Sequence, residues 1–163
     1  MKYIELTQGK FALVDDEDYK FLNKWSWSYS TYGYAIRSSP APKKQIIWLH
    51  RQIMNCPKGL FVDHINGNPL DNRKSNLRIC SHKQNMQNII KKKSHSSLYK
   101  GVVWVKERKK WVAAIHLNYK RFYIGGFENE LHAAMAYDLW AIEFFGQFAR
   151  TNFKVIAHSK SPI

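Results

Sequence analysis

Short stretches in which apolar and polar residues alternate make up most of the first third of the chain. Phe11 to Val14 and Trp25 to Tyr29 are two of them, and a period of two residues is typical of strands with one buried face. Another apolar run, Ile46 to Leu49, predicts a further strand, and His50 to Met54 is expected to begin a short helix. Residues 1–54 are therefore predicted to be mainly β.

The middle of the chain predicts a strand, a tight polar loop and a helix in succession. Leu60 to Ile65 suits a strand, and Asn66-Gly67 directly after it is a strong signal for a turn. Ser81, followed three residues later by a glutamine, matches a helix capping box. A helix is therefore expected to open there and to continue to about residue 90.

A second, smaller domain is predicted toward the end of the chain. An apolar-faced helix, expected from Glu130 to Phe145, follows three strand-like stretches: 101–105, 111–117 and 121–127. Asn129 is placed to cap that helix and Gly146 to end it. The expected fold class is α+β, with the chain in four parts: residues 1–93, a linker at 94–97, the second domain at 98–153 and a tail at 154–163.

The net charge of the chain indicates what kind of partner it binds. Lys and Arg number 26 against 12 Asp and Glu, so the formal net charge is +14 and the isoelectric point is near 9.8. Residues 19–110 hold 19 basic and only 3 acidic residues, which concentrates the positive charge in the middle of the chain. A polyanionic partner is therefore predicted.

Cysteine content, hydropathy and the N-terminal sequence exclude several classes of protein. Two cysteines, Cys56 and Cys80, are too few for a disulfide framework or a four-cysteine zinc site. The apolar runs are far shorter than the roughly 20 residues that a membrane-spanning helix needs. Because the N-terminus also lacks the order of a signal peptide, the chain is expected in the cytoplasm, with no membrane as partner.

Asp63 and His64 are the residues whose position suggests chemistry. They end a predicted strand, and Asn85 lies one turn into the helix expected to pack on that strand. A carboxylate and an amide oxygen can hold one hard cation and leave its other positions to water and substrate phosphate, which is how magnesium is usually bound. The adjacent imidazole can take a proton from water that attacks phosphorus. On these residues alone, an Asp-His pair at a strand end is most often polar surface.

A longer pattern around this pair resembles a known family. The spacing is 12 positions from His64 to Asn76 and 9 from Asn76 to Asn85. The pattern resembles the HNH homing-endonuclease family, which has a ββα-metal fold. It consists of four segments in order: Val62-Asp63-His64-Ile65-Asn66-Gly67-Asn68, Asp71-Asn72, Ser75-Asn76-Leu77-Arg78 and Gln84-Asn85.

The HNH resemblance implies a role for each matching residue. Asp63 and Asn85 would be metal ligands, His64 the general base, and Asn76 would hold the loop by hydrogen bonds. Many HNH enzymes have a second histidine where this chain has Asn85, so this chain resembles the phage and intron nicking subgroup. An asparagine oxygen favours Mg²⁺ or Mn²⁺, and no zinc is expected.

Four further residues near the pattern are alternatives or have no assigned role. His82 and Asn88 are alternatives for the last metal ligand and rank below Asn85. His50-Arg51 resembles a His-Arg pair that is common upstream in HNH enzymes; no role is assigned to the pair, and a phosphate contact by Arg51 is one alternative.

The second domain resembles the APETALA-two/ethylene-response-factor DNA-binding domain. That family uses a three-stranded antiparallel sheet, backed by one helix, to bind the DNA major groove. The resemblance covers roughly residues 98–153 and rests on six segments: Tyr99-Lys100-Gly101-Val102, Lys110 to Ile115, Ile124-Gly125-Gly126-Phe127, Ala133 to Asp138, Phe145-Gly146 and Asn152-Phe153. Positions that are Arg and Glu in the plant factors are Val103, Ala114 and His116 here, so the plant target sequence is not inherited.

Strand alternation predicts which residues of this domain face DNA. Trp111, Ala113 and Ile115 are expected to face the helix, and Val112, Ala114 and His116 the other side. By the same parity Phe122 and Ile124 point inward. The expected DNA-binding residues lie on the outer face, in the loops beside it or along the lysine run before it: Lys91, Lys92, Lys93, Lys100, Lys106, Arg108, Lys109, His116, Arg121 and Tyr123.

These observations favour a metal-dependent DNA endonuclease that acts on double-stranded DNA. Water activated by His64 would cut a phosphodiester bond to leave a 5′-phosphate and a 3′-hydroxyl, in a site-specific nicking or homing enzyme of a phage-infected bacterial host. The chain could be a monomer, which would nick, or a homodimer. Two alternatives remain: a DNA-binding regulator with a vestigial nuclease module, and a nuclease specific for RNA or for a DNA structure.

Overall fold

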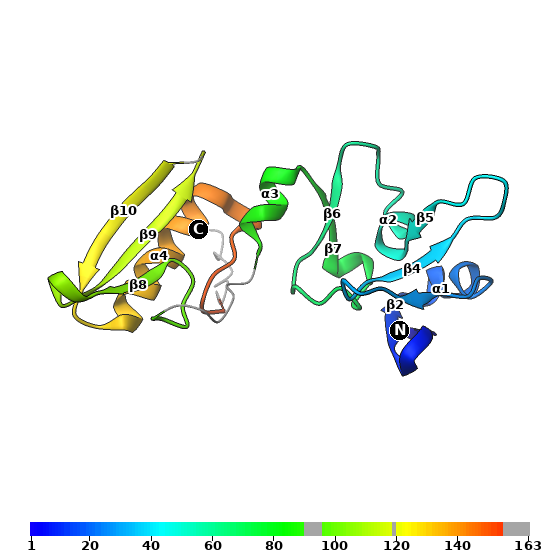
Figure 1. Cartoon of the computed structure of the whole chain (residues 1–163), viewed down its shortest axis with the longest axis horizontal. Coiled ribbons are helices and arrows are strands. Elements are labelled where there is room, and N and C mark those ends of the chain that lie inside the picture. Colours follow the sequence, from blue (N-terminus) through cyan, green and yellow to red (C-terminus); the bar gives the residue numbers. More distant parts are fainter. Residues whose placement is uncertain (90–95, 119, 155–163) are drawn as a thin grey trace, which may run out of the picture. The chain divides into compact units, whose positions relative to one another are not determined.

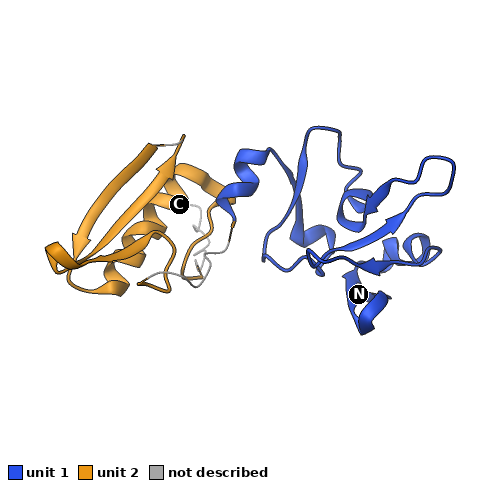
Figure 2. Cartoon of the chain, viewed as in Figure 1, with its two compact units in different colours: residues 1–88 blue, residues 89–163 orange. Residues whose placement is uncertain are grey.

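The fold is taken from a computed structural model that describes residues 1–89, 96–118 and 120–154. The chain divides into two compact units, residues 1–88 and 89–163 (Figure 2). Each unit combines helices with small antiparallel sheets, so the α+β prediction is confirmed. Lys91, Lys92 and Lys93, expected to contact phosphates, lie outside the described residues.

The first unit begins with two small sheets packed on a shared core (Figure 1). Residues such as Ile4, Val14 and Leu49 are almost fully buried in this core, which explains the alternating pattern of residues 1–54. The elements are β1 (Lys2–Glu5), β2 (Phe11–Val14), α1 (Asp16–Leu22), β3 (Ser28–Tyr29), β4 (Ala35–Ser38), β5 (Ile46–Trp48) and α2 (Leu49–Ile53).

The first unit ends with two strands and a helix that position the candidate site. Strand β6 (Phe61–His64) pairs antiparallel with β7 (Leu77–Cys80), and α3 (His82–Gln87) follows. Both hydrogen bonds of the predicted capping box are present at the start of α3. The helix is shorter than expected, because Asn88 is its C-cap and turns its amide toward β6. Strand β7 was missed by the sequence analysis.

The second unit is a three-stranded antiparallel sheet, in the order β10-β9-β8, with α4 packed against it (Figure 1). Its elements are β8 (Val102–Val105), β9 (Lys110–Leu117), β10 (Lys120–Phe127) and α4 (Glu130–Phe145). As predicted, the Asn129 side chain caps α4 by accepting from the Leu131 N–H at 2.8 Å, and Gly146 ends the helix.

Close packing and hydrogen bonds hold the two ends of the second unit. Gly101 has φ +77°, and a Cβ at this residue would overlap the ring of Tyr137 in α4, so only glycine fits. Asp138 accepts hydrogen bonds from the backbone and side chain of Asn152. At the other end, Ser96 and Ser97, expected in the linker, accept from backbone N–H groups of this unit, so they are part of it.

The parity prediction for β9 is confirmed for the face toward the helix, because Trp111, Ala113 and Ile115 all pack in the core clusters that contain α4 residues. On the other side, Val112 and Ala114 are only 3% and 6% exposed. Strand β9 is central, with β8 and β10 paired on either side, and both side chains are short. His116, near the end of the strand, is exposed as predicted.

None of the helices in the described part of the chain has the length and apolar character needed to cross a bilayer.

Candidate functional site

The carboxylate of Asp63 is held from two sides at the end of β6. Arg78, its register partner on β7, donates from Nε at 2.8 Å and from Nη2 at 2.5 Å to the same carboxylate oxygen. The other oxygen accepts from Nδ2 of Asn88 at 2.9 Å, and the same amide nitrogen donates to the carbonyl of His64 at 3.0 Å. Asp63 and Asn88 are 6% exposed. The end of β6 is thus tied to both β7 and α3.

Asn85 and Asn88 differ in their relation to Asp63. Asn85, the ligand expected from the spacing, is half-buried in α3, and its side chain makes no hydrogen bond to Asp63 within the described ranges. Asn88, which ranked lower, lies one turn further and contacts the carboxylate directly. The exposed His82 stacks on Phe61, with ring centroids 5.4 Å apart. The helix therefore brings one asparagine, rather than a histidine, to Asp63.

His64 is buried, with 6% of its surface exposed. Burial lowers its pKa, whereas a hydrogen bond with Asn72 and the nearby Asp63 and Asp71 act in the opposite direction. Its Nε2 lies 3.3 Å from Oδ1 of Asn72. Burial thus favours the uncharged imidazole, the form that can act as a general base.

Two rings from elsewhere in the first unit pack against His64. The ring centroid of His50 lies 5.2 Å from that of His64, and that of Tyr34 lies 5.9 Å away. Burial, together with the neighbouring His64 and Arg51, lowers the pKa of His50 to about 3. The sequence singled out His50 but gave no reason to place it beside the predicted base.

Arg51 has a structural role rather than the guessed phosphate contact. Its guanidinium donates to three backbone carbonyls, those of Leu60 at 2.6 Å, Pro57 at 3.0 Å and Cys56 at 3.2 Å. These bonds tie α2 to the turn that precedes β6. The guess about Arg51 is therefore corrected: its donors hold the backbone that leads into Asp63.

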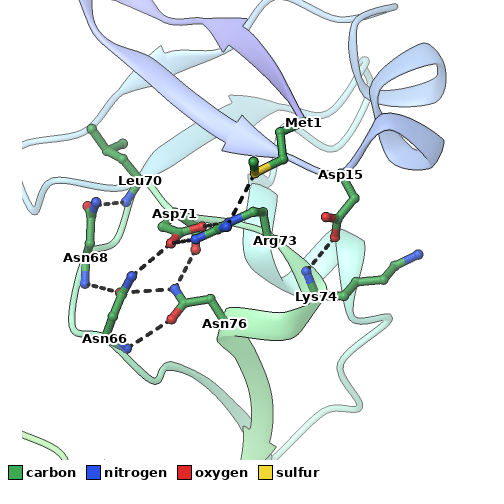
Figure 3. Close-up of polar contacts among 9 residues, drawn as sticks. All are labelled: Met1, Asp15, Asn66, Asn68, Leu70, Asp71, Arg73, Lys74 and Asn76. Carbon is green, nitrogen blue, oxygen red and sulfur yellow. Dashed lines mark hydrogen bonds and ion pairs between the residues drawn. The ribbon is translucent and has the colours of Figure 1, made fainter. Parts of the chain in front are cut away.

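A network of asparagine and aspartate side chains holds the loop between β6 and β7 (Figure 3). Oδ1 of Asn76 accepts from the Asn66 N–H at 3.0 Å, and Nδ2 donates to the Asp71 carbonyl at 2.8 Å. The carboxylate of Asp71 accepts from Nδ2 of Asn66 at 2.8 Å and pairs with Arg73, which lowers the pKa of Asp71. Asn76 thus makes the kind of contacts expected of a loop-holding residue, and Asp71 is a partner that the sequence did not assign.

The oxygen donors at this site fit a hard divalent cation. The carboxylate of Asp63 and an amide oxygen from α3 would supply two protein ligands, which leaves positions for water and a phosphate. No cluster of three or more His, Cys, Asp or Glu side chains suited to a metal occurs among residues 1–89, 96–118 and 120–154.

The outer face of the second unit carries most of the predicted DNA contacts. Phe122 packs on Phe144 of α4, with centroids 6.0 Å apart, so Arg121 and Tyr123 point to the opposite face. The guanidinium of Arg108 lies over the Tyr123 ring at 5.9 Å. Six of the expected residues are exposed at this face or in the turn beside it: Lys106, Arg108, Lys109, His116, Arg121 and Tyr123.

Lys100 differs from the other predicted DNA contacts. It is half-buried, and its ammonium donates to the Ile89 carbonyl at 2.9 Å. Burial, and to a lesser degree Arg150, lowers its pKa to about 8. The expectation that Lys100 lies outward, available to DNA, is therefore corrected: its amine is used within the second unit.

Comparison with known proteins gives matches along most of the chain. The HNH endonuclease family model matches residues 46–87, the segment from β5 to α3 that contains the site. An uncharacterized HNH endonuclease of Acanthamoeba polyphaga mimivirus is 35% identical over 151 residues, 89% of this chain and 76% of the relative. Protein 3.8 of Escherichia phage T7 is 37% identical over 119 residues, 68% of this chain and 90% of the relative.

A shorter match involves a plant protein. An AP2-like ethylene-responsive transcription factor of Arabidopsis thaliana is 46% identical over 41 residues, which is 25% of this chain and 8% of the plant protein. The viral relative, by contrast, aligns along nearly the whole chain, and the family model covers the strands, loop and helix around Asp63 and His64. The chain therefore belongs to the HNH endonuclease family and is a nuclease.

Proposed function

We propose that this nuclease hydrolyses phosphodiester bonds of double-stranded DNA in a metal-dependent reaction centred on Asp63 and His64. The observation that carries the proposal is the pair itself: a buried imidazole and a buried carboxylate end the same strand. The loop that follows them is pinned by Asn76. A base and a cation ligand held side by side are what water-driven phosphodiester cleavage needs.

In the proposed mechanism, His64 accepts a proton from the water that attacks phosphorus. The bond from phosphorus to the 3′-oxygen breaks, and the 3′-oxygen takes up a proton from solvent, which leaves a 5′-phosphate and a 3′-hydroxyl. Asp63, with the amide oxygen of Asn85 or Asn88, would hold Mg²⁺ or Mn²⁺, which stabilises charge on the phosphate when bound. Arg78 and Asn88 hold the Asp63 carboxylate in place beside the base.

The second unit is proposed to bind DNA through its basic outer face. Support comes from the exposed Arg108, Arg121 and Tyr123 and from the three-stranded sheet backed by one helix. The short plant-factor match lends the same idea limited support. Because the described part of the chain has one candidate nuclease centre, a monomer would nick and a homodimer could cut both strands.

The biological setting is also part of the proposal. Relatives from a giant virus and from phage T7 support a role in a mobile or viral genome. We therefore place the enzyme in the cytoplasm of a phage-infected bacterial host, as a site-specific nicking or homing enzyme.

Cleavage of a mixture of supercoiled plasmid and genomic DNA with Mg²⁺ tests the proposal. The wild type should cut, and His64→Ala should bind DNA equally well without cutting. Undiminished cleavage by His64→Ala would refute the assignment of the base. Binding without cleavage by the wild type, even on an enriched target, would favour the DNA-binding regulator. Preferred cleavage of competing RNA would show that RNA is the substrate.

A further inference from the structure

Asn72 is the one side chain that is hydrogen-bonded to the imidazole of His64 in the described part of the chain. Its Oδ1 lies 3.3 Å from Nε2 of His64. Asn72 belongs to the loop between β6 and β7 and is 1% exposed, among the most deeply buried polar residues of the first unit. A buried amide loses its hydrogen bonds to water, so burial this complete is costly unless the protein supplies partners for the amide.

The orientation of the Asn72 amide follows from its second contact. Nδ2 donates to the carbonyl of Pro69 at 3.2 Å. Because that carbonyl only accepts, the amide nitrogen must point to Pro69 and the amide oxygen to His64. An amide oxygen also only accepts, so Nε2 of His64 must carry the hydrogen. In the neutral ring Nδ1 is then unprotonated and free to accept a proton.

The backbone of Asn72 is hydrogen-bonded to β2, which lies far from β6 in the sequence. Its N–H donates to the Leu13 carbonyl at 2.8 Å, and the Leu13 N–H donates to the Leu70 carbonyl at 2.8 Å. The loop therefore adds to strand β2 on either side of Asp71. The hairpin of β1 and β2 therefore holds Asn72, whose side-chain amide contacts His64. The rings of His50 and Tyr34 contact the same imidazole.

We propose that Asn72 is a positioning residue for cleavage: its amide oxygen holds His64 in the tautomer whose Nδ1 is free to accept the proton of the attacking water. This inference rests on the proposed role of His64 as the base. An acceptor that receives a hydrogen bond from one ring nitrogen of a histidine keeps the proton on that nitrogen and leaves the other nitrogen to react. Here the acceptor is a side chain, so it can be replaced.

The tautomer can be measured directly by nitrogen NMR of the histidine rings in the full-length protein at pH 8.5. The His64 signals are assigned by their loss in His64→Gln. The wild type and Asn72→Asp, which keeps an acceptor oxygen, should show the Nε2–H form. Asn72→Ala should show a mixture or the Nδ1–H form. An Nδ1–H wild type, or an Asn72→Ala spectrum that matches the wild type, would overturn the proposal.

Kinetics supply a second readout, with Asn68→Ala as the matched control. Asn68 lies in the same loop and bonds its backbone, but it is exposed and does not contact His64. Asn72→Ala should lower kcat roughly 10- to 100-fold, the usual range for groups that orient a reacting side chain, with little change in KM for DNA. Asn72→Asp should recover part of kcat. An equal loss in Asn68→Ala would mean that Asn72 only stabilises the loop.

The two proposals fail in different ways. If His64→Ala still cuts DNA, the assigned base is wrong, whatever tautomer NMR detects. If His64→Ala is inactive while Asn72→Ala keeps both the wild-type tautomer and the wild-type kcat, the base stands and the role of Asn72 is wrong.

Discussion

Asn85 in α3 and Asn88, the C-cap of that helix, are the two candidates for one role beside Asp63, and metal titration distinguishes them. Asn88 contacts the Asp63 carboxylate at 2.9 Å, whereas the HNH spacing points to Asn85. We expect Asn88→Ala to raise the Mg²⁺ concentration for half-maximal cleavage about tenfold or more, because it removes a group that holds the ligand or is one itself. Asp63→Ala should abolish turnover at all Mg²⁺ concentrations. A larger rise in Asn85→Ala than in Asn88→Ala would assign the amide ligand to Asn85.

Acid is expected to destabilise the first unit through His50. Its pKa is about 3 in the folded chain, against 6.5 as the ordinary value. Between these values the unfolded chain binds a proton that the folded chain does not, so stability is full above pH 6.5 and falls as the pH drops toward 3. At pH 5 the loss is about 2 kcal/mol. Burial of His64 adds to it with the same sign.

Urea unfolding at pH 7.5 and pH 5 measures this loss. His50→Gln, which has no proton to gain, should show a smaller difference between the two pH values than the wild type. The exposed His82 in the same unit provides the control, since His82→Gln should keep the full difference. An unchanged pH dependence in His50→Gln would show that His50 is not the group that titrates.

Candidate site residues could be proposed from the sequence, but their contacts with one another could not. Asp63, His64 and Asn76 lie within a recognisable local spacing. The contacts of His64 with His50, Tyr34 and Asn72 depend on three different segments meeting, and a single sequence contains no signal for such long-range contacts. Arg51 was misjudged for a related reason: a surface arginine and a carbonyl-binding one look alike until the chain around them is folded.

At the scale of elements, the packing of α4 on the sheet depends on Gly101. Gly101→Ala combines a positive φ with overlap against the Tyr137 ring, and we expect it to destabilise the second unit by about 3 kcal/mol or more. Gly146→Ala is the matched control, since Gly146 also has a positive φ but nothing within 4 Å of a Cβ. Hydrogen exchange of residues 102–145 should increase more in Gly101→Ala. An equal increase in both variants would show that backbone strain alone matters.

Most elements were predictable because local patterns dictate them. The cap and end of α4 and the capping box of α3 depend on neighbouring residues, and they were confirmed. Strand β7 was missed because Leu77 to Cys80 is short and partly polar, and it becomes a strand only by pairing with β6. Strand parity assigned Val112 and Ala114 to a side of the sheet but carries no measure of burial, which for a central strand also depends on the strands paired on either side.

At the scale of the whole molecule, charge alone does not decide where DNA binds, because a net charge of +14 attracts any polyanion. The proposal that DNA binds to the outer face of the second unit is more specific, and it can be tested independently of this general attraction. Arg121 and Lys120 are neighbours on β10, both exposed, and strand alternation turns them to opposite faces of the sheet. Replacing either one by alanine removes the same unit of charge from nearly the same place.

Arg121→Ala should therefore weaken binding to a cleavable duplex about tenfold or more, as loss of a base or phosphate contact does. If the lost contact is to a phosphate, the slope of log K against log salt should also decrease by about one. Lys120→Ala should change both quantities much less, and neither variant should alter the rate of cleavage once DNA is saturating. Equal weakening by the two substitutions would mean that the second unit contributes charge without a defined DNA-binding face.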